Sequence, residues 1–352
     1  MTETLELLVP GLLGPVPPLA QPLETPTLDL LLDRAEGVAA SQRDPASVLL
    51  ARFGAEASAP YALADDDPSW DRGGWWLHAD PVHLRPDRDQ LRLFDASHLG
   101  ISRGEADALV AELNNHFAGD GLKLHAPAPD RWYVQYDAPL DLETTPLARV
   151  SGRHIDGFLP TGDDASRWAA LMTEAQMLLF QSAVNGAREA AGRPAVNGLW
   201  CWGGGAWQLP KTPPVLALGA APLLRGLASA AGIEQRDRPG ADAAGLTATG
   251  AARVLVLWDG LSDALRDRDE AAWAAAATAL ERWLAPLPAA LRRGELGELC
   301  IDTCDGNSWV LRRADLRWYR RRLRRPRTLL ARATAGASAA PDLSPPTGLP
   351  RR

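Results

Sequence analysis

Apolar residues recur at helical spacing in several stretches of the chain, which predicts a helix in each. The predicted helices cover residues 28–39, 47–55, 102–117, 163–192, 223–232 and 269–287. In residues 102–117, Ser102 and Glu105 have the spacing of a capping box, which marks a helix start. Gly192 suits the end of the 163–192 helix.

Short apolar or alternating runs, bounded by glycine or proline, predict strands. They cover residues 5–10, 74–79, 90–96, 214–219 and 252–260, with two strands each in 122–139 and 297–313. Strands that alternate with helices favour an α/β core with a mostly parallel sheet. We expect that core to comprise residues 1–69 and 146–330, with a small α+β insertion at 70–145. Residues 331–352, rich in alanine, proline and serine, are expected to be disordered.

The segment PAVNGLWCWGGGAWQLP, residues 194–210, combines large aromatic rings with bare backbone. If residues 197–202 form a strand, Trp200 and Trp202 share one face, and Gly203, Gly204 and Gly205 follow its C-terminal end. Ligands usually bind at that end in open α/β sheets, and glycine lets backbone N–H groups approach an anion. The alternative interpretation is a tight turn beneath tryptophans that fill a core.

Composition narrows the class of protein. The chain has 352 residues and a formal net charge of −7, without a long apolar run or a basic leader, so neither a membrane span nor a secretory signal is expected. Cys201, Cys300 and Cys304 have the spacing of neither a disulfide framework nor a zinc site. These features predict a cytoplasmic protein.

One cluster has residues suited to metal binding. HADPVHLRPDRD supplies Asp80, His83, Asp87 and Asp89, whose oxygens and imidazole suit one divalent ion. The alternative is a loop whose aspartates cap turns and pair with neighbouring arginines. Ser151 and Thr161 are the nearest candidate nucleophiles, but neither has an identifiable base, so the catalytic residues stay unknown.

Basic charge gathers near the C-terminus, where nine arginines and one acid, Asp315, lie between Arg312 and Arg327. Leu316, Tyr319 and Leu323 fall on one helical face, so this segment is expected to dock on the core. A nucleic-acid surface is the alternative to a solvated helix. Nucleic-acid binding is not favoured, because the chain is acidic and no nucleic-acid fold signature accompanies the arginines.

The tryptophan–glycine segment resembles part of the archaeal-type, cofactor-independent phosphoglycerate mutases. The matching residues are Asn185, Arg188, Gly192, Pro194, Asn197, Trp200, Trp202, Gly203 and Gly205. The chain also resembles the RpfE-type regulatory proteins, through ADPVHLRPDRDQLRL, the LLRGLA segment and residues 318–325. The resemblance implies an alkaline-phosphatase-like fold, and in the mutases two divalent metals with a Ser or Thr nucleophile.

The sequence departs from the mutase pattern where metal ligands are expected. Pro10 follows the first strand in place of an aspartate, and no histidine occurs after His154. Asp259 and Asp263 follow a later strand, where an aspartate is also a common helix N-cap. The Gly-His ligand pair that the mutase resemblance implies after the 252–260 strand is missing, and the later Gly-Asp-His motif is absent from the sequence too.

These observations lead to three hypotheses. The first is a non-catalytic, regulatory or ligand-binding protein on a degenerate mutase scaffold, without a cofactor, that binds an anionic or phosphorylated small molecule or a protein partner. Its expected ligand-binding residues are Arg188, Asn197, Trp200, Trp202, Gly203, Gly204 and Gly205. The second is a metal-dependent phosphoglycerate mutase or phosphohydrolase with a site rebuilt from Asp80, His83, Asp87 and Asp89. In the third, the tryptophans only fill a core.

Overall fold

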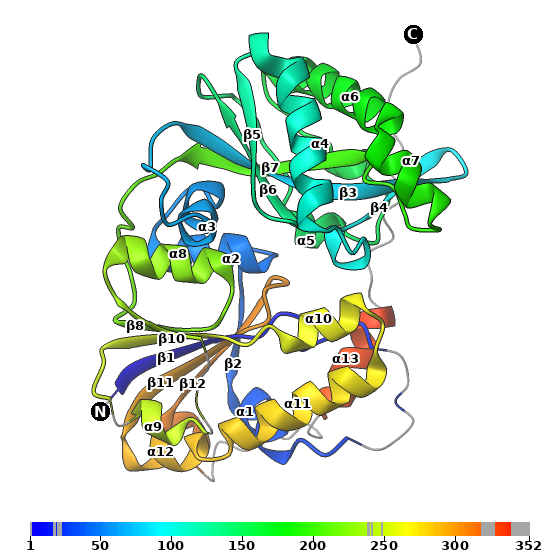
Figure 1. Ribbon diagram of the computed structural model, residues 1–352. Helices are drawn as coiled ribbons and strands as arrows, with labels where there is room; N and C mark the ends of the chain where they lie inside the picture. Colours follow the sequence, from blue (N-terminus) through cyan, green and yellow to red (C-terminus); the bar gives the residue numbers. More distant parts are fainter. Residues whose placement is uncertain are drawn as a thin grey trace, which may run out of the picture. The chain divides into compact units, whose positions relative to one another are not determined.

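The chain forms two compact units in the computed structural model, which describes residues 2–16, 19, 23–237, 240, 242–247, 249–317 and 328–338. Unit 1 comprises Met1–Ser41, Pro239–Ala252 and Val256–Arg352, and unit 2 comprises Gln42–Arg238 and Arg253–Leu255. Strand β10 (Arg253–Leu257) runs across the boundary between them. Figure 1 shows the helices and strands of both units, which together form a mixed α/β chain.

Unit 1 contains a parallel pair of strands with antiparallel neighbours. Strand β1 (Thr2–Leu8) runs parallel to β11 (Leu296–Asp302), and β12 (Asn307–Arg312) pairs antiparallel with β11 and with β2 (Glu36–Ala39). The helices are α1 (Pro26–Arg34), α9 (Ala244–Thr247), α10 (Gly260–Arg266), α11 (Glu270–Leu284), α12 (Leu287–Arg293), α13 (Leu329–Ser338) and the 3₁₀ turn η4 (Arg313–Leu316). Helix α11 buries Trp273, Leu280 and Trp283, which confirms the apolar face predicted for it.

Two predictions in unit 1 are wrong. The helix expected at residues 28–39 ends at Arg34, and residues 36–39 form the exposed strand β2, because β12 offers them a hydrogen-bonding edge and Gly37 and Val38 are poor helix formers. Residues 331–338 are not a disordered tail but lie in α13, whose alanines favour a helix and whose Leu329 and Ala333 are fully buried. Residues 339–352 lie outside the described residues.

Unit 2 is built on a five-stranded antiparallel sheet (Figure 1). Four strands follow the order β4-β3-β6-β5. The fifth, β7, also pairs with β3, on the edge opposite β6. The strands of this sheet are β3 (Trp75–Asp87), β4 (Gln90–Phe94), β5 (Leu122–Ala128), β6 (Arg131–Tyr136) and β7 (Gly198–Ala206). Outside this sheet, β8 (Leu216–Leu218) runs parallel to β9 (Glu234–Arg236). The first residues of β3 pair with β6 and its last residues pair with β4.

Unit 2 also contains α-helices and 3₁₀ turns, some of which pack on the two faces of this sheet. They are α2 (Pro45–Phe53), α3 (Ala59–Asp66), η1 (Ala96–His98), α4 (Arg103–His116), η2 (Phe117–Gly119), α5 (Leu147–Val150), η3 (Asp156–Phe158), α6 (Ala165–Gln181), α7 (Ala183–Ala190) and α8 (Pro222–Ala231). One core contains residues of α4 and α6 with Leu77, Leu199 and Cys201 of the sheet. A second core, on the opposite face, contains Val82, Leu84 and Trp200. The compact unit that holds β3–β6 therefore extends well beyond residues 70–145.

The helix predicted at residues 163–192 is interrupted. Ser182 has an extended backbone, and its hydroxyl accepts a hydrogen bond from the backbone N–H of Val184, so α6 ends at Gln181 and α7 starts at Ala183. The capping box at Ser102 and Glu105 is confirmed at the start of α4. Across the described ranges, none of the helices is long and apolar enough to cross a membrane.

Candidate functional site

The tryptophan–glycine segment forms strand β7, which continues through all three glycines. The expectation of a glycine loop after the strand is therefore wrong, and so is its placement at a parallel sheet, because β7 pairs antiparallel with β3. Trp200 lies opposite Asp80 and Trp202 lies opposite His78, which confirms that the two tryptophans share a face. The binding of a ligand by this segment stays a prediction.

At each glycine of the run, a different neighbouring residue leaves no room for a Cβ atom. Gly203 has a φ of +67°, and a Cβ there would collide with the Ser58 hydroxyl. A Cβ on Gly204 would lie 2.7 Å from Cη2 of Trp75, and one on Gly205 would collide with Cβ of Ala57. The glycines therefore let the segment before α3 and the Trp75 ring approach the strand, and this packing supports the structural interpretation of the run.

A small buried polar cluster lies on the tryptophan face of β3. The indole Nε1–H of Trp202 donates to Oδ2 of Asp80 at 2.6 Å, and the Trp202 ring stacks on His78 with ring centres 4.1 Å apart. Nε2 of His78 lies 3.2 Å from the hydroxyl of Ser58. Burial raises the pKa of Asp80 to about 7, against the hydrogen bond from Trp202, and burial lowers the pKa of His78 to about 3.

A small cavity borders the glycine run. It has a volume of about 100 Å³, and its lining residues are Glu56, Ala57, Tyr61, Gly204, Gly205, Ala206 and Gln208. The charged group of this lining is the carboxylate of Glu56, which pairs with Lys211 at 3.0 Å. A carboxylate at its edge makes this cavity a poor site for an anion.

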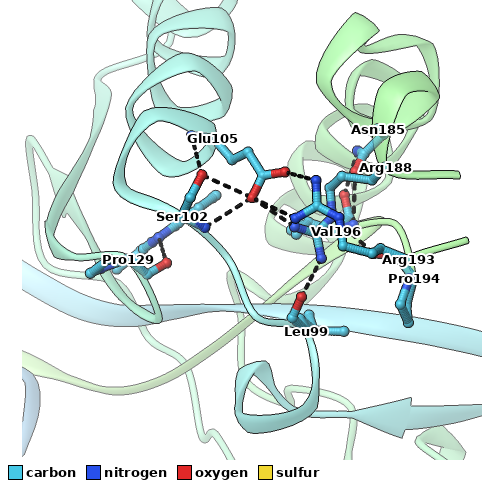
Figure 2. Close-up of polar contacts among 10 residues, drawn as sticks. Leu99, Ser102, Glu105, Pro129, Asn185, Arg188, Arg193, Pro194 and Val196 are labelled. Carbon is cyan, nitrogen blue, oxygen red and sulfur yellow. Dashed lines mark hydrogen bonds and ion pairs between the residues drawn. The ribbon is translucent and has the colours of Figure 1, made fainter. Parts of the chain in front are cut away.

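The other residues that match the mutase segment hold the backbone around the start of β7 (Figure 2). The amide of Asn185 bonds both the N–H and the carbonyl of Val196, and Asn197 does the same with Leu84 of β3. These bonds fix the path of the chain into the sheet, where loss of one partner would leave buried backbone groups unpaired.

Arg188 is completely buried in this network. Its guanidinium donates to Glu105 at 2.9 Å, to the carbonyl of Pro194 at 2.9 Å and to the carbonyl of Leu99 at 2.5 Å (Figure 2). Arg193 pairs with the other carboxylate oxygen of Glu105. Burial acts to raise the pKa of Glu105, but the hydrogen bonds from Ser102 and Arg193 and the charge of Arg188 lower it to about 2. Arg188 and Glu105 therefore connect α7 to the start of α4.

The four candidate metal ligands do not converge. The expected loop is strand β3, whose successive side chains point to opposite faces, so Asp80 lies with Trp202 while His83 and Asp87 lie on the other face. Nδ1 of His83 is bonded to the carbonyl of Ala195 at 2.9 Å, and Asp89 lies in the turn before β4. Across the part of the chain that the structure describes, no three His, Cys, Asp or Glu residues form a group that could hold a metal ion. This donor set does not fit a divalent metal.

The remaining candidates are also engaged or lie outside the described residues. The hydroxyl of Ser151 donates to Asp95, and that of Thr161 donates to Glu143 at 3.3 Å. Burial raises the pKa of Asp259, and Asp263 pairs with Arg266. Most of the arginine-rich segment, residues 318–327, lies outside the described residues, including Tyr319 and Leu323 of its predicted helical face. Leu316, the first residue of that face, is buried in the 3₁₀ turn η4.

A row of cationic side chains that was not predicted from the sequence lies on one face of the β3–β4 hairpin. Arg85 lies directly opposite Arg92, and Arg92 lies opposite His154, which adds a short bridge beside β4. Asp87 accepts from Arg92 at 2.9 Å and pairs with His154 at 3.1 Å. The hydrogen bond from His154 and the charge of Arg92 lower the pKa of Asp87.

Two arginines of this hairpin have no acidic partner among the described residues. The guanidinium of Arg85 lies 4.7 Å from the ring centre of Phe94, and Arg88 occupies the hairpin turn with a φ of 60°. We call Arg85, Arg88 and Arg92 the arginine row. Alternation of His83, Arg85 and Asp87 along the chain was the signal that could have revealed it, but two prolines concealed the strand.

Comparisons with known proteins point to one class. No protein-family model matches the sequence. The chain is 27% identical over 178 residues to the 2,3-bisphosphoglycerate-independent phosphoglycerate mutase of Methanosarcina acetivorans, covering 47% of this chain and 44% of that protein. It is 36% identical over 107 residues to the enzyme of the same name from Methanothrix thermoacetophila, covering 29% and 27%. The chain thus aligns with less than half the length of these relatives.

Two solved structures are also similar. One is the cofactor-independent phosphoglycerate mutase of Thermoplasma acidophilum, 16% identical with a TM-score of 0.38, covering 88% of this chain and 89% of that one. The other is the PH0037 protein of Pyrococcus horikoshii, 15% identical with a TM-score of 0.46, covering 88% and 87%. The sequence relatives therefore support a phosphoglycerate-mutase-like scaffold.

Proposed function

We propose that this chain is a cytoplasmic, non-catalytic binding protein on a phosphoglycerate-mutase-like, alkaline-phosphatase-like scaffold, with the regulatory role that the RpfE-type resemblance implies. It recognises an anionic or phosphorylated group, carried by a small molecule or by a protein partner. The residues that match the mutase segment serve the backbone and the core, and the candidate metal ligands point to different faces of β3.

The arginine row is the observation that carries this proposal. Arg85 and Arg92 are cross-strand partners, and like charges in that position destabilise a sheet. Asp87 accepts from Arg92 and offsets part of this repulsion, while the exposed Arg85 and Arg88 have no acidic partner among the described residues. Arg88 adds strain, because a side chain at φ 60° costs more than glycine. An anion beside the row would offset the repulsion and accept charge-assisted hydrogen bonds from the guanidinium groups.

Isothermal titration of the full chain with 3-phosphoglycerate, with and without MnCl2, tests the proposal. We expect metal-independent binding and no conversion to 2-phosphoglycerate, with the Methanosarcina acetivorans enzyme as the active control. Arg88→Gly should weaken binding roughly tenfold without loss of stability. The matched control is Arg268→Gly, an exposed arginine in unit 1 with a φ of 55°, which should leave the affinity unchanged. Two bound manganese ions per chain with mutase turnover would overturn the proposal.

A second candidate function is a metal-dependent phosphoglycerate mutase or phosphohydrolase with a rebuilt site. The observation in its favour is Asp80, because burial raises its pKa to about 7, a value suited to acid–base chemistry near neutral pH. This function requires metal-dependent turnover of a phosphate ester that Asp80→Asn abolishes in a folded protein. Turnover that is indifferent to chelators would count against it.

A further inference from the structure

Helix α6 exposes an apolar, nearly uncharged face to solvent. Phe180 is 81% exposed and Met177 is 60% exposed, and both are large hydrophobic side chains. Over the 17 residues of α6, the charged residues are Arg167 and Glu174 alone. A surface helix normally presents several charged residues to water, so this face resembles an interaction surface.

The rest of this face is made of small side chains. Ser166, Ala169, Ala170 and Thr173 are exposed and share the helical spacing of Met177 and Phe180. The Thr173 hydroxyl donates to the carbonyl of Ala169 at 2.8 Å, so burial of this hydroxyl would not leave its donor unpaired. Small residues let a second helix approach closely, and the larger side chains then pack beyond them.

We propose that a second copy of this chain covers the face, with α6 packed antiparallel to α6 about a twofold axis beside Ala170. Charge complementarity selects this occupant. Arg167 and Glu174 are seven residues apart on one flank of the helix, about 10 Å along its axis, and have opposite charges. An antiparallel pair centred between them places Arg167 opposite Glu174 of the partner subunit, twice over, because the interface is isologous.

The same axis accounts for the exposed hydrophobic residues at the two ends of the helix. With the centre beside Ala170, Phe180 extends past Ala165, the first residue of the partner's α6, towards the turn that precedes that helix. Leu159 in that preceding stretch of chain is itself 52% exposed. The pairing would therefore bury large apolar side chains at both ends and the small ones at the centre, where burial stabilises association.

Sedimentation velocity of the full chain over a wide concentration range tests the pairing. We expect a dimer, which Phe180→Glu converts to a monomer. Arg167→Glu and Glu174→Arg should each raise the dimer dissociation constant about tenfold, and the double variant should restore it. The restoration is the decisive result, because it requires the two residues to face each other across the axis.

Leu209→Glu is the matched control, since Leu209 is 67% exposed in the same unit but lies outside α6, and it should leave the dimer intact. Thermal unfolding of each variant checks folding, because Arg167 also lies over the Tyr136 ring and Glu174 pairs with His116. A monomer at every concentration would overturn the proposal. So would a dimer that survives Phe180→Glu, or a double variant no tighter than the single ones. This inference does not rest on the proposed binding function.

Discussion

Adding a methyl group at Gly205 tests whether the glycine run is needed for close packing against the segment before α3. A Cβ there would collide with Ala57, so Gly205→Ala should destabilise the protein by about 1–3 kcal/mol. Gly186→Ala is the control, because it lies in α7 with no atom within 4 Å of the added carbon, and it should stabilise by about 0.5–1 kcal/mol. Urea unfolding measures both, and Ala57→Gly should rescue Gly205→Ala. Equal stability of Gly205→Ala and wild type would contradict the packing explanation.

Arg188 offers a second test at the same scale, because it was expected to bind a ligand and instead has three partners inside the protein. Arg188→Met should cost about 3–5 kcal/mol, since it removes one ion pair of Glu105 and leaves the carbonyls of Leu99 and Pro194 without this buried donor. Arg193→Met removes an arginine from the same carboxylate, but its side chain is 44% exposed, so about 0–1 kcal/mol is expected. A stable Arg188→Met that loses 3-phosphoglycerate binding would instead support the ligand-binding role.

At the scale of elements, strand β3 carries two different environments on its two faces, and Asp80 makes the buried face pH-dependent. Its folded pKa of about 7 lies above the usual aspartate value of 3.8, so the folded state binds the extra proton and stability is lost as pH rises between these values. Asp80→Asn removes this ionisation and keeps an acceptor for Trp202. Relative to wild type, the variant should gain about 3 kcal/mol in unfolding free energy between pH 4.5 and pH 8.

Urea unfolding of wild type and Asp80→Asn at both pH values measures this gain. The comparison cancels the contribution of His78, whose lowered pKa acts in the opposite direction in both proteins. Asp89→Asn is the control, because Asp89 is an exposed carboxylate in the hairpin turn. The unfolding free energy of this variant should change with pH as that of wild type does. A difference between Asp80→Asn and wild type that stays constant with pH would show that Asp80 does not titrate in this range.

For the whole molecule, structural features that depend on residues close in sequence were predicted correctly. Features that depend on contacts between residues far apart in sequence were not. The capping box at Ser102 needs residues three apart, so it was readable from the sequence. Whether Gly203–Gly205 form a loop or a strand depends on Ala57, Ser58 and Trp75, more than a hundred positions away, so the sequence could not decide it.

The candidate metal ligands lie apart for a similar reason. Strand β3 continues through Pro81 and Pro86, although proline normally demotes a strand, and this continuation sends Asp80 and His83 to opposite faces. The arginine row was hidden by the same prolines, because its members align only when β3 and β4 pair. Sequence similarity to the mutases supported the scaffold, but the roles of Arg188 and Asn197 came from their contacts.

The boundaries of the folded units give the last prediction. A fragment of residues 42–238 contains every strand of the five-stranded sheet and both of its cores, so it should unfold cooperatively and retain the near-ultraviolet dichroism of packed tryptophans. A fragment of residues 70–145, the insertion expected from the sequence, lacks β7 and α6, and with them Trp168, Leu199 and Trp200 of the two cores. It should stay unfolded, because three or more strands also need a covered apolar face. Cooperative unfolding of the shorter fragment would instead make the insertion an independent domain.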